Sequence, residues 1–247
     1  MLTGSDQRKN WRMNDKYRFK YAVRFVLISI TLLWSVKALE LTSQFDFSEF
    51  GIFPRTLKGS MGIFFAPFIH GNVFHLISNT FPLIFLGIGL FYFYHKIAWQ
   101  VILAIYLMSG FWVWLAAREA YHIGASGVIY GLIFFMLLSG FIRKNTRSLA
   151  ISFVVILLYG GNMFLGIIPV DNGVSWESHL MGAIAGTFLA IYFRGTELEH
   201  EKAAENSVEN STAMPSEFHY YYKESDTSTE VRKYNYRLNE ENKSETD

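Results

Sequence analysis

The chain has 247 residues, of which 51% are hydrophobic and only 17% are charged, and its mean hydropathy is +0.19. A soluble domain usually carries about 25% charged residues, so this composition favours a membrane protein and excludes a single soluble globule. The absence of cysteine excludes disulfides, a thiolate zinc site and a cysteine nucleophile.

The formal net charge of +1 conceals two parts of opposite charge. Residues 1–194 contain 16 Lys and Arg against 8 Asp and Glu, whereas residues 195–247 contain 6 against 13. We expect a basic cytoplasmic N-terminus over residues 1–20, a membrane domain over residues 21–194, and an acidic cytoplasmic tail over residues 195–247. The tail has too few large apolar residues to build a core, so we expect it to be disordered or weakly helical.

Six apolar segments follow the N-terminus. They lie at about 21–41, 74–94, 98–117, 125–142, 148–168 and 178–194. A bilayer core about 30 Å thick needs about 20 helical residues. The sequence therefore predicts an all-α polytopic membrane bundle of six transmembrane helices, the sixth short enough to be enclosed by others. The long connection over residues 42–73 is rich in phenylalanine, so we expect it to lie in the membrane interface.

Lysine and arginine are distributed unevenly between the two sides of this arrangement. The first 24 residues carry seven of them, and the connection between the fourth and fifth segments carries Arg143, Lys144 and Arg147. Because positively charged short loops face the cytoplasm, we expect both termini in the cytoplasm. The second, fourth and sixth segments then begin at the outer face of the membrane.

Polar residues gather at the outer ends of these three segments, where polar groups are costly and usually mark a functional site. His75 and Asn79 are four residues apart and therefore share one helix face. Ser126 follows Gly124 at a junction between loop and helix, and His179 begins the sixth segment. A serine hydroxyl beside a neutral imidazole has the groups needed for acyl transfer.

In that chemistry His179 would take the proton of Ser126 and return it to the leaving amine. The first-turn N–H of Ser126, together with His75 and Asn79, would hold the developing oxyanion, and Gly124 is a further candidate for the oxyanion or substrate-binding site. Since no carboxylate stands where it could orient His179, the sequence predicts a Ser–His dyad rather than a triad.

Two glycine pairs predict how the fourth and sixth helices meet. They are Gly127 with Gly131 and Gly182 with Gly186. Small faces of this kind let helices pack backbone to backbone, which would bring the serine and the histidine to a similar depth. Each feature also has a simpler explanation: glycine packing alone, an interhelical hydrogen bond of His75 with Asn79, or aromatic packing of Tyr130. We expect His70 and His122 to be structural or interfacial.

Taken together, these residues resemble the rhomboid family of intramembrane serine proteases. The matching motifs are His70-Gly-Asn-Val-Phe-His75-Leu-Ile-Ser-Asn79, Gly124-Ala-Ser126-Gly127 and His179-Leu-Met-Gly182-Ala-Ile-Ala-Gly186. The resemblance implies Ser126 as nucleophile, His179 as base, His75 and Asn79 at the oxyanion site, and Tyr130 packed against the imidazole. Many relatives carry a Trp-Arg pair in the first loop, where this chain has Phe53-Pro54-Arg55.

The resemblance further implies an endopeptidase of the compact six-helix bacterial type, placed in a bacterial inner membrane. Its expected partners are transmembrane protein substrates and the lipid bilayer, with no nucleic acid, no metal and no other cofactor. Three alternatives stay open: a non-catalytic rhomboid-like membrane chaperone or trafficking protein, a small transporter or channel, and a metalloprotease. The last two are disfavoured because the inner halves of the helices have almost no ionisable residues and no His-Glu-x-x-His occurs.

Overall fold

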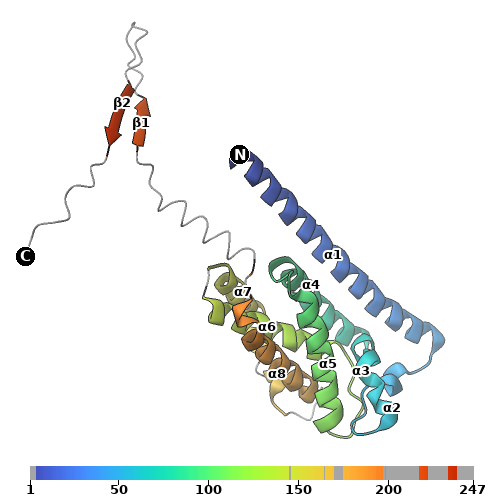
Figure 1. Cartoon of the computed structure of the whole chain (residues 1–247). Helices are drawn as coiled ribbons and strands as arrows, with labels where there is room; N and C mark the ends of the chain where they lie inside the picture. The colour runs from blue at the N-terminus through green and yellow to red at the C-terminus, as the bar shows by residue number, and fades with distance from the viewer. Residues whose placement is uncertain are drawn as a thin grey trace, which may run out of the picture. The chain divides into compact units, whose positions relative to one another are not determined.

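The structure, a computed structural model, describes residues 4–144, 146–163, 165–169, 175–196, 198, 217–221 and 233–237 (Figure 1). The chain forms two units, Met1–Leu198 and Glu199–Asp247. Helices and the loops between them make up the described residues of the first unit, apart from one isolated β-bridge between Ile52 and His122, which confirms the all-α bundle predicted from the apolar segments.

Six long helices make up this unit. They are α1 (Gly4–Ser43), α4 (Val73–Phe93), α5 (Ala98–Ala116), α6 (Ser126–Arg143), α7 (Thr146–Met163) and α8 (Trp176–Tyr192). Five of them match the predicted segments closely at the N-terminal end. The first helix is longer than predicted, because the basic N-terminal residues continue it as polar helix instead of preceding it.

Membrane-spanning capacity is clear for four of these helices. Within the described residues, Asp15–Ser43 of α1 and the whole of α4, α5 and α6 are long and apolar enough to cross a membrane. The apolar part of α7 is Ser148–Gly161, and α8 has 17 residues. The chain is therefore an integral membrane protein, while the six-span count, the orientation of the termini and the bacterial inner membrane stay predictions.

Helix α6 is the centre of the bundle. It packs against α4, α5, α7 and α8, and 61% of its span is buried, against 22% for α1 and 33% for α4 and α5. Helix α8 packs against both α5 and α6, which explains how so short a helix is accommodated. Helix α1 lies along α4 on one side of the bundle (Figure 1).

The long connection between α1 and α4 is folded. It contains the short turns η1 (Phe47–Phe50), α2 (Leu57–Ser60), α3 (Gly62–Phe65) and η2 (Ala66–Phe68). Several hydrogen bonds attach it to α5 and to the loop after α5. Among them, Trp114 Nε1 donates to the Thr56 carbonyl (2.9 Å), Arg55 to the Ala117 carbonyl (2.8 Å), and the Gly124 N–H to the Ala66 carbonyl (2.9 Å). This connection therefore holds the residues that lead into α6.

The remaining turns are η3 (Leu165–Ile167), after α7, and η4 (Phe193–Gly195), after α8. In the second unit, β1 (Glu217–Tyr221) and β2 (Lys233–Arg237) pair antiparallel, with Phe218 opposite Tyr236 and Tyr220 opposite Tyr234. The tail was expected to be disordered or weakly helical; at these residues it has paired strands instead, and their aromatic content favours extended pairing. The rest of the predicted tail, except Gly195, Thr196 and Leu198, lies outside the described residues.

Candidate active site

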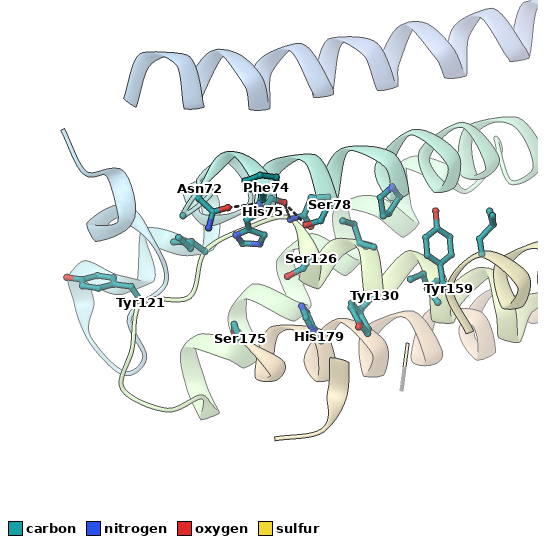
Figure 2. Close-up of a pocket in the computed structure, with 17 residues that line it drawn as sticks. Asn72, Phe74, His75, Ser78, Tyr121, Ser126, Tyr130, Tyr159, Ser175 and His179 are labelled. Atoms are coloured by element: carbon teal, nitrogen blue, oxygen red, sulfur yellow. Dashed lines mark hydrogen bonds between the residues drawn. The ribbon is translucent and has the colours of Figure 1, made fainter. Parts of the chain in front are cut away.

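A cavity of about 810 Å³ lies between α4, α6, α7 and α8 (Figure 2). It reaches from the start of α4 at Asn72 to Tyr159 on α7. Its polar lining includes His75, Asn79, Ser126, Tyr130, Ser175 and His179. Five of the site residues predicted from the sequence thus face one space, although they come from three helices.

Ser126 is the first residue of α6, and its side chain points into the cavity from the helix start (Figure 2). The chain reaches this position through Gly124, whose φ of +101° is one that residues with a side chain rarely adopt. A Cβ there would also lie 2.7 Å from Cε1 of His75. The N–H of Gly124 is already bonded to Ala66, so the N–H groups that can face an oxyanion are those of the first turn of α6, which include the N–H of Ser126.

His179 lies on the first turn of α8 and is only 7% exposed. Its Nδ1 is 2.8 Å from the carbonyl oxygen of Gly166. Since a carbonyl can only accept, Nδ1 carries the hydrogen, and Nε2 is left with a free lone pair. The ring stacks on Tyr130, with centroids 4.1 Å apart and an interplanar angle of 7°. Together these two contacts fix both the tautomer and the plane of the imidazole.

The hydrogen bonds of the described residues include none between the Ser126 hydroxyl and His179. Both side chains nevertheless line the same cavity. Catalytic hydrogen bonds are often long in the free enzyme and tighten only when substrate is bound. The arrangement therefore has a serine and a neutral imidazole in one space, without a preformed bond between them.

The Gly166 carbonyl contacts the His179 ring at the nitrogen that a carboxylate would contact in a triad, and the sequence did not predict this contact. A Cβ at this position would overlap the Tyr130 hydroxyl and lie 3.2 Å from Nδ1 of His179. Glu177, the acidic residue nearest to His179 in sequence, instead pairs with Arg118 at 3.3 Å. Every residue has a backbone carbonyl, so the sequence cannot indicate which one contacts His179. The contact becomes apparent only from the position of the turn η3 after α7.

His75 and Asn79, the two oxyanion candidates on α4, both take part in hydrogen bonds in the first turns of that helix. Asn72 caps α4 by accepting the His75 N–H at 2.8 Å, and Nδ2 of Asn79 donates to the His75 carbonyl at 2.8 Å. One amide hydrogen of Asn79 is thus already used inside the helix, and one remains for a ligand. The His75 ring lies beside Gly124, close to the start of α6.

The glycines expected to pack α6 against α8 lie at the contact between these helices. A Cβ at Gly182 would overlap the Gly127 carbonyl oxygen, and one at Gly186 would overlap the Gly131 carbonyl oxygen. In the reverse direction, a Cβ at Gly131 would be 3.2 Å from the Gly182 carbonyl oxygen. The close approach of the two backbones places the starts of α6 and α8, and hence Ser126 and His179, on the same cavity.

Comparison with known proteins identifies the family. The sequence profile of the rhomboid domain matches residues 58–196, more than half of the chain. The chain belongs to the rhomboid family. An uncharacterized protein of Mycobacterium bovis is 32% identical over 209 residues, covering 79% of this chain and 85% of that protein. An uncharacterized protein of Mycobacterium leprae is 33% identical in an alignment that covers 74% of this chain and 76% of that protein. RHOMBOID-like protein 4 of Arabidopsis thaliana is 30% identical in an alignment that covers 56% of this chain and 36% of that protein.

Beside the candidate active-site cavity, this rhomboid has a buried polar cluster that joins α1 to the start of α4. Lys37 of α1 bonds to Glu40 at 2.7 Å and donates to the His70 carbonyl at 2.7 Å. The His70 ring is 1% exposed, and its centroid is 5.1 Å from that of His75. Burial lowers the pKa of His70 to about 4, as do the neighbouring His75 and Lys37, although the Phe68 carbonyl opposes the shift.

This shift predicts a loss of stability in mild acid. The unfolded chain takes up a proton at His70 near the ordinary pKa of 6.5, whereas the folded chain does so near 4. The stabilising effect is therefore complete above the unfolded pKa and is lost as the pH falls toward the folded pKa. Between about pH 7 and about pH 5.5, His70 should lower the free energy of unfolding by about 1 kcal/mol. Thermal unfolding in detergent micelles should show a shallower acid slope for His70→Phe; equal slopes would contradict the assignment.

Proposed function

We propose that this rhomboid is an intramembrane serine endopeptidase that cleaves transmembrane or juxtamembrane segments of other membrane proteins. One observation carries the proposal: His179 donates from Nδ1 to Gly166, so Nε2 can act as a base in the cavity that holds Ser126. Stacking on Tyr130 supplies the second constraint on the ring. The inference depends on these contacts together with membership of the family.

In the proposed reaction, Oγ of Ser126 attacks the scissile carbonyl carbon while Nε2 of His179 takes the hydroxyl proton. The carbonyl oxygen becomes an oxyanion that the Ser126 N–H, the free Asn79 N–H and His75 can stabilise. When the C–N bond breaks, His179 returns the proton to the leaving amine. Water entering the cavity then hydrolyses the acyl-serine, with His179 again as base.

The substrate class follows from the environment of the site. A peptide bond inside a helix is shielded by its hydrogen bonds, so a transmembrane substrate has to unwind before Ser126 can attack. We expect small or helix-breaking residues near the cleaved bond, close to the outer end of the substrate helix. With both termini in the cytoplasm, α4, α6 and α8 begin at the outer face, and the chain would act in a bacterial inner membrane.

Reconstitution with a fluorophosphonate probe tests the nucleophile directly. The protein in liposomes should be labelled at Ser126, as located by peptide mass spectrometry, and should cleave members of a panel of transmembrane substrates with unstable outer helix ends. Ser126→Ala should lose both labelling and cleavage. If the folded, unmutated protein reacts with no probe and cleaves no substrate, the non-catalytic chaperone or trafficking role becomes the better explanation.

A further inference from the structure

A second histidine–serine pair lies next to the proposed dyad and does not belong to it. His122, in the loop between α5 and α6, is 2% exposed, and its Nδ1 is 2.6 Å from Oγ of Ser175. Nε2 of the same ring is 3.0 Å from the Arg118 carbonyl oxygen. Ser175 precedes α8 and caps it by accepting the Ser178 N–H at 3.3 Å.

The directions of these hydrogen bonds can be assigned from their partners. The Arg118 carbonyl only accepts, so Nε2 of His122 carries the hydrogen and Nδ1 must accept from the Ser175 hydroxyl. Oγ of Ser175 then accepts from the Ser178 hydroxyl at 2.7 Å. Burial lowers the pKa of His122, while the hydrogen bond to the Arg118 carbonyl and the charge of Glu177 oppose this shift and the charge of Arg118 adds to it. A neutral ring is the form that this chain of hydrogen bonds requires.

The loop that carries His122 is itself held in place. The backbone of His122 exchanges two hydrogen bonds with that of Ile52, at 2.9 and 3.0 Å, and the Gly124 N–H donates to Ala66 at 2.9 Å. The histidine side chain therefore connects the start of α8 to a loop fixed against the connection between α1 and α4. A second link between this loop and the first turn of α8 is the ion pair of Arg118 with Glu177 at 3.3 Å, whereas the His122 bond reaches the capping residue Ser175 itself.

The hydrogen bond between His122 and Ser175 joins the segments that lead directly into the two residues of the proposed dyad. His122 stands four residues before Ser126, and Ser175 stands four residues before His179. The His179 N–H also donates to the Ser175 carbonyl at 3.4 Å, so the histidine follows any shift of the cap. We propose, on the basis of the proposed function, that His122 and Ser175 are positioning residues: their hydrogen bond holds the start of α8 against the start of α6 and thereby sets the distance between His179 and Ser126.

Two readouts test this role, one of activity and one of local structure. A misplacement of about 1 Å can cost about 100-fold in rate, so His122→Phe and Ser175→Ala should lower kcat by about 10–100-fold. In His122→Phe the KM for a transmembrane substrate should change less than about twofold, because His122 does not line the cavity and the variant removes no substrate contact. Hydrogen–deuterium exchange at the Ser178 and His179 amides should become faster in both variants.

Two further variants separate positioning from a general loss of structure. Ser175→Thr keeps a hydroxyl on the same carbon and should retain most of the kcat that Ser175→Ala loses. Thr56 caps α2 in the same way, accepting the Gly59 N–H at 3.1 Å, but lies outside the cavity. Thr56→Ala should therefore leave kcat and the exchange of the α8 amides unchanged.

The outcomes that overturn the proposal are distinct. Unchanged exchange at Ser178 and His179 in His122→Phe would mean that the bond does not hold the helix start. Faster exchange with unchanged kcat would mean that the start of α8 does not set the catalytic distance, and an inactive Ser175→Thr would exclude rescue by the hydroxyl. Labelling of Ser175 by a fluorophosphonate would make it a nucleophile instead. If the unmutated protein leaves Ser126 unlabelled, the proposed function fails, and the exchange data still decide whether the bond holds α8.

Discussion

Replacing His179 with alanine should lower kcat for peptide cleavage by about 1,000-fold or more, as should replacing Ser126. The reason is that Nδ1 of His179 is bonded to Gly166, so that Nε2 of the same ring would be the base of the proposed dyad. Because a nucleophile and its base act as one unit, the Ser126→Ala/His179→Ala double variant should be no slower than either single variant. Initial rates on one substrate in liposomes would measure all three.

A matched histidine controls for the loss of an imidazole in general. His95 lies in the turn after α4, and it does not line the active-site cavity. His95→Ala should keep kcat within about twofold of the unmutated protein. A double variant that loses the product of the two single losses would contradict the dyad, since it would show that the two residues contribute independently.

Much of the helical framework could be predicted because it depends on long apolar runs. The segment predicted at 74–94 is the helix Val73–Phe93, and the one predicted at 98–117 is Ala98–Ala116. The shared cavity could be anticipated as well, because glycine spacing on α6 and α8 limits how these two helices can pack. The cavity could be inferred because both the helix packing and the polar site depend on particular residue types that recur at helical spacing.

The contacts that orient the site could not be predicted in this way. Gly166 acts through a backbone carbonyl, which every residue has, and the bond to His179 exists only because η3 turns back toward α8. His122 and Ser175 are 53 residues apart, and neither shares a helix face with the other. The strands at 217–221 and 233–237 were missed because the low apolar content of the whole tail outweighed two short aromatic runs.

Replacing Gly182 with alanine should disrupt the contact between α6 and α8, and with it the active site. The added Cβ would overlap the Gly127 carbonyl oxygen and lie 2.9 Å from the carbonyl carbon and 3.2 Å from Cα. These are backbone atoms that cannot rotate aside, so the helices have to separate. Overpacking of this kind typically lowers the free energy of unfolding by about 1–3 kcal/mol. The same separation moves His179 away from Ser126, so kcat should fall by about 100-fold.

A glycine-to-alanine change at an open position should raise the stability of the fold instead of lowering it, which makes it a strict control. A Cβ at Gly161 on α7 would meet no atom within 4 Å. Alanine in a helix is favoured over glycine by about 0.5–1 kcal/mol, so Gly161→Ala should raise the unfolding temperature slightly and leave kcat unchanged. Thermal unfolding in detergent micelles and rates in liposomes would compare the two variants. If Gly182→Ala were as stable and as active as Gly161→Ala, backbone contact between α6 and α8 could not be what holds the serine and the histidine on one cavity.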